Sequence, residues 1–139
     1  MSAEIRHLPQ RDDGRDAVYL QSFAVHYEYP VHFTEHLFAP ANPVFRDTLQ
    51  RREPGRRHRF VVFIDANVAA SFPSLAHEIA GYASRHAEAM TLVTHPEVVP
   101  GGEPVKNDPA LLTRLQQRLV ELGIDRHAVV VGIGGGAFL

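Results

Sequence analysis

The chain has 139 residues, 45% of them hydrophobic and 22% charged, with a formal net charge of −2 and no cysteine. These values suit one globular domain of about 100–150 residues, and the lack of cysteine excludes disulfides, thiolate catalysis and zinc–thiolate sites. The near-neutral charge argues against a general nucleic-acid-binding protein, and no segment reaches the ~20 consecutive apolar residues that a membrane span needs. We therefore expect a cytoplasmic protein with neither nucleic acid nor a membrane as a partner.

The first residues differ in composition from the rest. Residues 1–17 are polar and of mixed charge, which is not the pattern of a secretory signal. We expect them to form a mobile leader, and residues 18–139 to form one NAD-binding α/β domain, for reasons given below.

Two runs typical of strands follow the leader, at residues 18–28 and 31–38, with Pro30 between them. Phe23, Val25 and Tyr27 alternate with less apolar neighbours at the period of two that a half-buried strand shows. The two runs predict an N-terminal antiparallel hairpin. Residues 39–43 then break the pattern with two prolines, and residues 44–52 are expected to form a short helix.

A basic cluster at residues 51–59 surrounds the turn-forming pair Pro54-Gly55. It is interpreted either as a solvated loop before a buried strand or as a patch for an anion or nucleic acid, and we favour the loop.

The second half of the chain alternates strands with helices. Continuous or nearly continuous apolar runs predict buried strands at residues 60–64, 91–94 and 128–133. Between the first two, a helix should begin near Pro73 and Ser74, with its apolar face formed by Leu75, Ile79, Tyr82 and Ala83. This order predicts parallel βαβ units with right-handed crossovers, and therefore a Rossmann-like parallel sheet.

The clearest helix lies before the last strand. Asp108 is a suitable N-cap, Pro109 suits the first helical position and Gly123 can end the helix. Its buried stripe is expected to consist of Leu111, Leu112, Leu115, Leu119 and Leu122. After the last strand come Gly134-Gly135-Gly136 and three more residues. A helix normally follows such a turn, so we favour a truncated N-terminal domain over a small complete one.

Ligands of parallel α/β sheets bind beyond the carboxyl ends of the strands, where three polar or glycine-rich segments of this chain should meet. The first is Asp65-Ala66-Asn67, directly after the strand at residues 60–64. Its carboxylate can accept hydrogen bonds from ribose hydroxyls, and Asn67 can donate and accept. Taken alone, an Asp-x-Asn after a strand more often forms an Asx turn than a ligand site.

The second segment is PGGEPVK, residues 100–106. Its glycines allow close approach of a ligand to the backbone, while Glu103 offers an acceptor and Lys106, the only lysine of the chain, offers a compact cation. The alternative is a loop with a surface ion pair. The third segment, Gly132 to Ala137, fits G-x-G-x-x-A, although the helix and the downstream acid of the dinucleotide fingerprint are missing. Its backbone N–H groups can still face a pyrophosphate.

Taken in order and spacing, FIDANV (63–68), PGGEPVK (100–106), the leucine-rich helix and LGIDRHAVVVGIGGG (122–136) resemble 3-dehydroquinate synthase and related sugar phosphate cyclases. Tyr29-Pro30-Val31 before Phe33 and Leu37 resembles the first hairpin of that family, so the resemblance covers residues 29–139. The combination of PGGExxK with a triple glycine is more specific than either motif alone.

The resemblance implies that this chain binds NAD. Asp65 and Asn67 would hold the adenosine ribose, Glu103 and Lys106 would contact the ribose and nicotinamide side, and Gly134, Gly135 and Gly136 would pass beneath the pyrophosphate.

It also implies a carbon–oxygen lyase activity, in which a heptulose or heptulosonate phosphate loses phosphate and closes by an intramolecular aldol reaction. A divalent metal, zinc or cobalt, takes part in that family, and the protein is expected to be a homodimer. The metal ligands and the catalytic residues of the family follow the triple glycine. We therefore expect no catalytic and no metal-binding residue in this chain, and no activity from the 139 residues alone.

The segment His32-Phe33-Thr34-Glu35-His36 stands where dehydroquinate synthases have a glycine-containing turn. It is closer to the valiolone-type or uncharacterised branches, so the sugar phosphate substrate stays open. Two alternatives also stay open: a stand-alone nucleotide-binding module, and an NAD-dependent oxidoreductase that resembles glycerol dehydrogenase.

Overall fold

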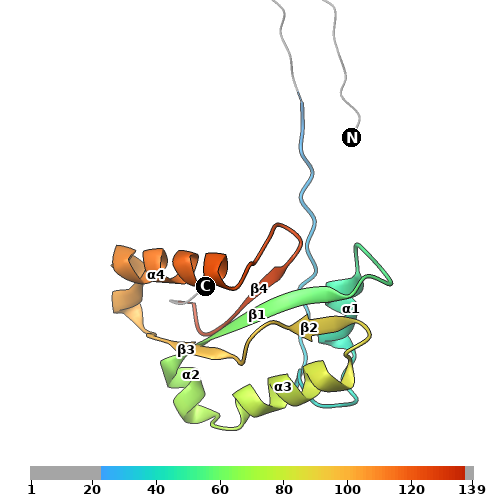
Figure 1. Cartoon of the computed structure of the whole chain (residues 1–139), viewed down its shortest axis with the longest axis horizontal. Helices are drawn as coiled ribbons and strands as arrows, with labels where there is room; N and C mark the ends of the chain where they lie inside the picture. Colours follow the sequence, from blue (N-terminus) through green and yellow to red (C-terminus); the bar gives the residue numbers. More distant parts are fainter. Residues whose placement is uncertain (1–22, 137–139) are drawn as a thin grey trace, which may run out of the picture. The chain divides into compact units, whose positions relative to one another are not determined.

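The computed structural model describes residues 23–136, so the expected leader at residues 1–17 and the last three residues lie outside the described part. The chain divides into two compact units, Met1–Val31 and His32–Leu139. In the first unit, the described residues 23–31 form neither helix nor strand. All helices and strands of the described part belong to the second unit (Figure 1).

The sheet of the second unit is built around β1 (His58–Asp65), and all its strand pairs are parallel. β2 (Met90–Leu92) pairs with the first half of β1, β3 (Glu97–Val99) with the second half, and β4 (Val129–Ile133) with residues 60–64. Phe60 of β1 pairs with both β2 and β4, and Phe63 and Ile64 pair with both β3 and β4. A residue in a sheet has one neighbouring strand on each side, so β4 lies on the side of β1 opposite to β2 and β3. β1 is therefore central, and the chain adds strands first to one side of it and then to the other.

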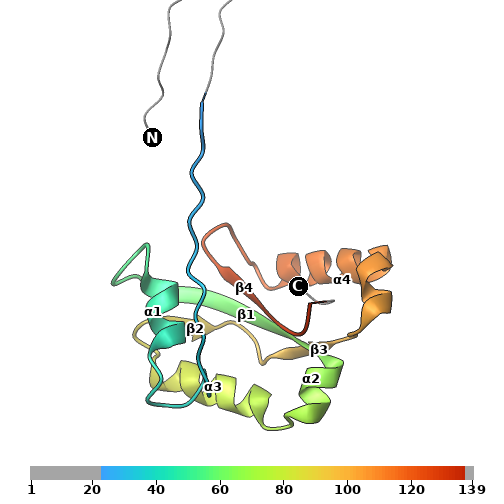
Figure 2. The ribbon, with the colours of Figure 1, turned by 180° about the vertical axis from the view of Figure 1, so that it is seen from behind.

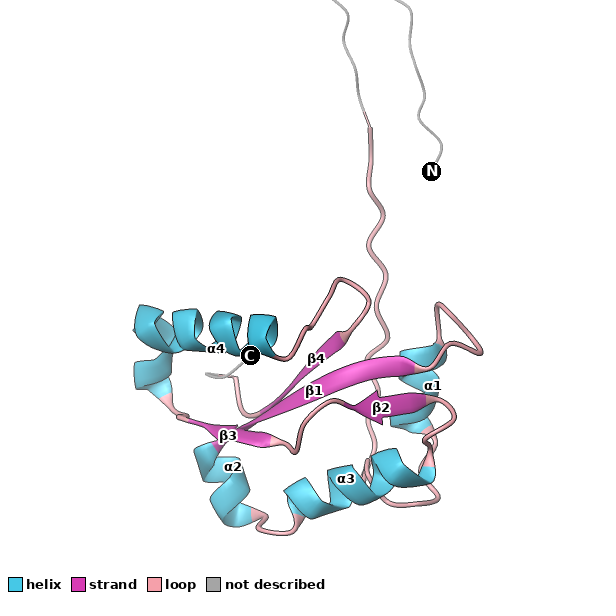
Figure 3. Ribbon diagram, viewed as in Figure 1, coloured by secondary structure: helices cyan, strands magenta, loops and turns pink. Residues whose placement is uncertain are grey.

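Both faces of β1 are covered, which explains why its sequence is apolar throughout. Phe60, Val62 and Ile64 face one core cluster, to which α1 (Val44–Gln50), α2 (Ala66–Ser71) and α3 (Leu75–Arg85) contribute side chains. Val61 and Phe63 face a second cluster under α4 (Pro109–Glu121). Figures 2 and 3 show α4 and α3 on opposite sides of the sheet.

The larger cluster contains a group of aromatic rings that ties the segment before β1 to the sheet. Phe38, Phe45, Phe60 and Tyr82 meet edge to face, with centroid distances from 5.3 to 6.1 Å. The hydroxyl of Tyr82 donates to the Asn42 carbonyl at 2.7 Å and accepts from the Arg46 amide at 3.4 Å. Burial of this hydroxyl raises the pKa of Tyr82 above its ordinary value, despite the opposing hydrogen bond from Arg46.

The predicted strands and helices of the second half are confirmed, with shifted ends. Asp108 caps α4 by accepting from the Leu111 amide at 2.9 Å, and Gly123 follows the helix with a positive φ of 60°. On α3, Ile79, Tyr82 and Ala83 are buried as predicted, and Leu75 packs against the same cluster. Among the described residues, no helix has the length and apolar character needed to cross a bilayer.

Two predictions about elements are wrong, and three short elements were not predicted. No strand is present in residues 23–38, the described part of the predicted hairpin. A two-stranded ribbon is marginal by itself, and the large apolar side chains at residues 23–33 are exposed, whereas Leu37 and Phe38 belong to the larger core cluster. On α4, Leu112 is 58% exposed, because it lies beside the stripe that faces the sheet. The elements without a prediction are α2, β3 and the 3₁₀ helix Glu103–Asn107.

Candidate functional site

The three segments singled out from the sequence follow β1, β3 and β4 directly at the carboxyl edge of the sheet. Asp65 is the last residue of β1 and is paired with Val99, the last residue of β3. On the other side of β1, Ile64 is paired with Ile133, the last residue of β4. The loops therefore leave three neighbouring parallel strands at nearly the same level, and β1 is the strand at which the order of addition changes sides. In open parallel sheets, this is the position where ligands bind.

Asp65 has a local structural role in this edge. It is 5% exposed, and its Oδ1 accepts from the Asn67 amide at 2.7 Å, which makes Asp65 the N-cap of α2. The hydrogen bond from the Asn67 amide to the Asp65 side chain is the contact that the Asx-turn interpretation predicts. A carboxylate has about four lone pairs, so this one bond leaves capacity for ligand hydroxyls. The Asn67 side chain belongs to an exposed residue in the first turn of α2.

Gly101 lies directly against the carboxylate of Asp65. A Cβ on Gly101 would overlap all three atoms of that carboxylate group. The loop after β3 can thus approach the end of β1 only because residue 101 has no side chain. The next residue, Gly102, has φ 88° and ψ 176°, a conformation that essentially only glycine adopts. The close approach to Asp65 thus accounts for Gly101, and the backbone conformation accounts for Gly102.

Glu103 and Lys106 lie in the 3₁₀ helix after this loop and pair with each other. Lys106 Nζ is 3.1 Å from Glu103 Oε1, and both side chains are exposed. This is the surface ion pair that the sequence offered as the alternative interpretation. Exposed pairs of this kind contribute about 0–1 kcal/mol, so a ligand could replace the contact at little cost.

The triple glycine follows β4, and residues 134–136 form no helix. A Cβ on Gly135 or Gly136 would meet nothing within 4 Å, and neither residue has a φ in the left-handed region. The packing and backbone of the described residues therefore give no reason for glycine at these two positions. Open space above a glycine-rich turn is what the close approach of a ligand to backbone N–H groups requires.

The structure thus brings two pairs of the predicted residues into contact, Asp65 with the Asn67 amide and Glu103 with Lys106, and adds the contact of Asp65 with Gly101. It places Gly134 beside the end of β1 through the register of β4. The sequence did not indicate that Gly101 serves the packing of Asp65. A prediction that β3 pairs with the end of β1 would have placed Gly101 beside Asp65. A strand of three residues is too short to be recognised from its sequence pattern.

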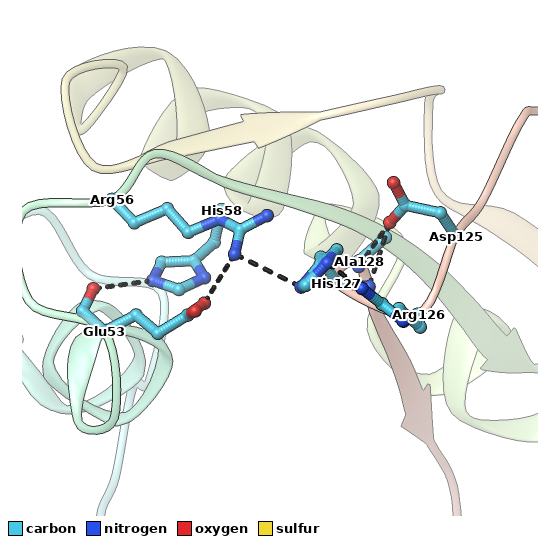
Figure 4. Close-up of polar contacts among 7 residues, drawn as sticks. All are labelled: Glu53, Arg56, His58, Asp125, Arg126, His127 and Ala128. Atoms are coloured by element: carbon cyan, nitrogen blue, oxygen red, sulfur yellow. Dashed lines mark hydrogen bonds and ion pairs between the residues drawn. The ribbon is translucent and has the colours of Figure 1, made fainter.

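A second polar cluster lies at the opposite edge, where β1 and β4 begin (Figure 4). Arg56 Nη1 donates to Glu53 Oε2 at 2.8 Å and lies 3.2 Å from His127 Nδ1, while Arg126 Nε lies 3.1 Å from the other ring nitrogen. The buried His58 lies 3.3 Å from the Glu53 carbonyl through Nε2. The basic segment is thus an exposed loop before a buried strand, as favoured from the sequence.

In the same cluster, Asp125 orders the turn before β4. Its Oδ1 accepts from the amides of His127 at 2.9 Å and Ala128 at 3.1 Å. The hydrogen bond from His127 is the main reason why the pKa of Asp125 lies below its ordinary value. Asp125 is thus a counterpart of Asp65: each carboxylate caps a turn, one at each edge of the sheet.

No other grouping in the described residues suggests chemistry. Within residues 23–136 there is no set of three or more His, Asp or Glu side chains placed to hold a metal ion. A shallow, open hollow is lined by His32, Phe33, Thr34 and Glu35. These four residues come from one exposed stretch of chain, so we assign it no function.

Comparison of the chain with known protein families, with curated proteins and with solved structures found no match in any of the three.

Proposed function

We propose that this chain is the NAD-binding part of a sugar phosphate cyclase of the 3-dehydroquinate synthase type, with a Rossmann-like arrangement of its parallel sheet. The observation that carries the proposal is the convergence of three loops at the carboxyl edge, at the strand where the order of addition reverses. The family assignment rests on the sequence resemblance of PGGEPVK and the triple glycine.

The residues of this edge fit a dinucleotide. Asp65 would accept hydrogen bonds from the two hydroxyls of the adenosine ribose, with the carboxylate held in place by its bond to the Asn67 amide. Because the Asn67 side chain is exposed in the same turn, it could add a further polar contact.

The triple glycine would bind the pyrophosphate through backbone N–H groups. The open space at Gly135 and Gly136 supports this role, since no contact with the described residues 23–136 requires glycine there. Lys106 would give up part of its exposed pairing with Glu103 to a cofactor oxygen, and the freed Glu103 would accept from a hydroxyl. NAD supplies hydride transfer when bound, and this chain positions it.

The described residues do not fit the divalent metal that the cyclase family uses, because no group of three suitable ligands is present in residues 23–136. The proposal therefore assigns no metal ligand within residues 23–136, and it gives the residues of this edge a cofactor-binding role only. The proposal places the elimination and aldol steps on residues other than those of this edge.

Asp65→Asn tests the cofactor-binding part of the proposal. Asn can still accept from the Asn67 amide and cap α2, but it lacks the charge that strengthens bonds to ribose hydroxyls. We expect NAD to bind at least about tenfold more weakly, which corresponds to about 1.4 kcal/mol, as measured by calorimetric titration. Asp125→Asn makes the same change in a similar turn at the opposite edge and should leave NAD affinity unchanged.

The cyclase part is tested by expressing the complete reading frame of the gene and following phosphate release from heptulose and heptulosonate phosphates. The proposal expects a cyclised product and inorganic phosphate. NAD-dependent oxidation of a small alcohol without phosphate release would instead favour the glycerol-dehydrogenase-like alternative, and NAD binding with no turnover would favour a stand-alone nucleotide-binding module.

A further inference from the structure

The turns before β1 and β4 bring two arginines onto one histidine at the edge where these strands begin (Figure 4). Phe60 pairs with Val129, so the residues just before the two strands lie side by side, although 71 positions separate Arg56 from His127. Arg56 Nη1 lies 3.2 Å from Nδ1 of His127, and Arg126 Nε lies 3.1 Å from Nε2 of the same ring. Both ring nitrogens therefore face a guanidinium N–H.

These contacts bring together more hydrogen-bond donors than acceptors. A neutral imidazole has one N–H and one acceptor nitrogen, a protonated imidazole has two N–H groups, and arginine can only donate. In every protonation state of His127, at least one guanidinium N–H therefore faces another N–H. An acceptor that enters from outside the cluster would remove this mismatch.

The acids nearby do not supply that acceptor. Glu53 Oε2 accepts from Arg56 at 2.8 Å, and Asp125 Oδ1 accepts from two amides of the turn before β4. Arg126 forms no ion pair with an acid of residues 23–136, and its two Nη groups have no partner among them. The acceptor must therefore come from a ligand or from water.

The charge of this edge favours an anion over water. Residues 53–59 and 125–128 contain four arginines and two acids, which gives a local charge of +2 with neutral histidines in a chain whose net charge is −2. One of these arginines, Arg59, is held close to the turn because its guanidinium donates to the carbonyls of Leu122 and Gly123. Water could accept from the free donors, but it would not offset the excess positive charge.

We propose that Arg56, His127 and Arg126 bind a terminal phosphate group, either inorganic phosphate or the phosphate monoester of a small molecule. Three donor side chains converge here, and a phosphate monoester offers three terminal oxygens and a charge of about −1.5 to −2 at neutral pH. The planar guanidinium group matches pairs of phosphate oxygens. A phosphodiester, by contrast, offers only two free oxygens and one charge, which leaves one of the three side chains without an acceptor.

This site is separate from the proposed cofactor site. β1 has 8 residues and runs from one edge of the sheet to the other, a length of about 25 Å. A phosphate held beside Arg56 is therefore not the pyrophosphate of a cofactor bound at the carboxyl edge. The inference does not depend on the proposed function.

Titration of the isotope-labelled chain with inorganic phosphate tests the site through amide chemical shifts, with the ionic strength kept constant by chloride. We expect saturable shifts that are largest at residues 53–59 and 125–128, with a Kd on the order of 1 mM. Methyl phosphate should bind at the same residues, and whichever of the two binds more tightly identifies the source of the phosphate group. Dimethyl phosphate, the matched diester, should bind at least about tenfold more weakly than methyl phosphate. Absence of saturable shifts, or equal affinity for the diester, overturns the proposal.

Two arginine variants separate this site from general attraction to positive charge. Arg126→Gln and Arg114→Gln each remove one charge from an exposed arginine, but Arg114 lies on α4 and not at this edge. Arg126→Gln should bind inorganic phosphate at least about tenfold more weakly, and Arg114→Gln should bind it as the unmodified chain does. Equal affinities of the two variants, or displacement of phosphate by NAD, contradict the assignment. The NAD affinity of Arg126→Gln should be unchanged, so the phosphate site can fail while the proposed function holds.

Discussion

Asp65 and Gly101 bring two loops of the carboxyl edge into close approach. The carboxylate occupies the space in which a side chain of residue 101 would lie, and Oδ1 is fixed by the Asn67 amide. The contact joins the end of β1 to the loop after β3. A ligand that met this edge would find its acceptor already in position, which reduces the cost of ordering it on binding.

Gly101→Ala should therefore destabilise the fold. The added methyl group overlaps the buried carboxylate, and overpacking of this kind typically costs about 1–3 kcal/mol of unfolding free energy. Urea denaturation followed by circular dichroism measures the loss. Gly135→Ala is the matched control, because its Cβ would meet nothing within 4 Å, and its unfolding free energy should change by no more than about 0.5 kcal/mol. Equal stability of the two variants would contradict the contact.

Tyr82 gives the fold an alkaline limit. Its raised pKa means that the folded state holds the phenolic proton more tightly than the unfolded state does. The stabilisation is fully present below the ordinary tyrosine pKa of 10.0 and is lost as the pH rises from there through the folded-state pKa.

In Tyr82→Phe, this part of the pH dependence should disappear. The variant also loses two hydrogen bonds and should be less stable at neutral pH by about 1 kcal/mol. Urea midpoints measured at a series of pH values from neutral to strongly alkaline check both statements. An unchanged alkaline slope in the variant would show that Tyr82 is not its source.

At the scale of elements, burial on both faces of β1 made the sheet predictable. Continuous apolar strands that alternate with amphipathic helices predict a parallel sheet. The ends of α4 were also predictable, because Asp108 and Pro109 mark its start and Gly123 marks its end. The short elements carried too few residues for a period to show: α2 has six residues and β3 has three. The predicted hairpin had the right alternation, but alternation indicates an apolar face without indicating what covers it.

The candidate site was predictable to a similar degree. The three loops follow from strand order, because carboxyl ends of parallel strands share an edge. The pairing of Glu103 with Lys106 and the overlap at Gly101 depend on side-chain positions that spacing alone does not determine.

The two leucines at the start of α4 test which face of that helix supports the sheet. Leu111 is 8% exposed and Leu112 is 58% exposed, although they are neighbours. Leu111→Ala should lower the unfolding free energy by about 2 kcal/mol or more, as cavities in a core do. Leu112→Ala should cost far less, because alanine is also the best helix former. Thermal denaturation of both variants provides the comparison, and a larger effect at Leu112 would place the wrong face on the sheet.

At the scale of the whole molecule, the two edges of the second unit carry different chemistry. The edge at which β1 and β4 begin is held by arginines, histidines and Asp125 in contacts that tie loops together (Figure 4). The opposite edge combines a buried acid, glycines that allow close approach and open backbone. We propose nucleotide binding for the carboxyl edge alone. A nucleotide should therefore affect residues at the carboxyl edge and leave those at the start of β1 and β4 unchanged.

The most direct test of this account is a titration of the isotope-labelled chain with NAD, followed by amide chemical shifts in two-dimensional NMR spectra. The account predicts that the largest shifts occur at residues 65–67, 101–106 and 134–136, with smaller or no shifts at residues 53–59 and 125–128. Absence of shifts at millimolar NAD, or a maximum at the edge that contains Arg56 and His127, would contradict it.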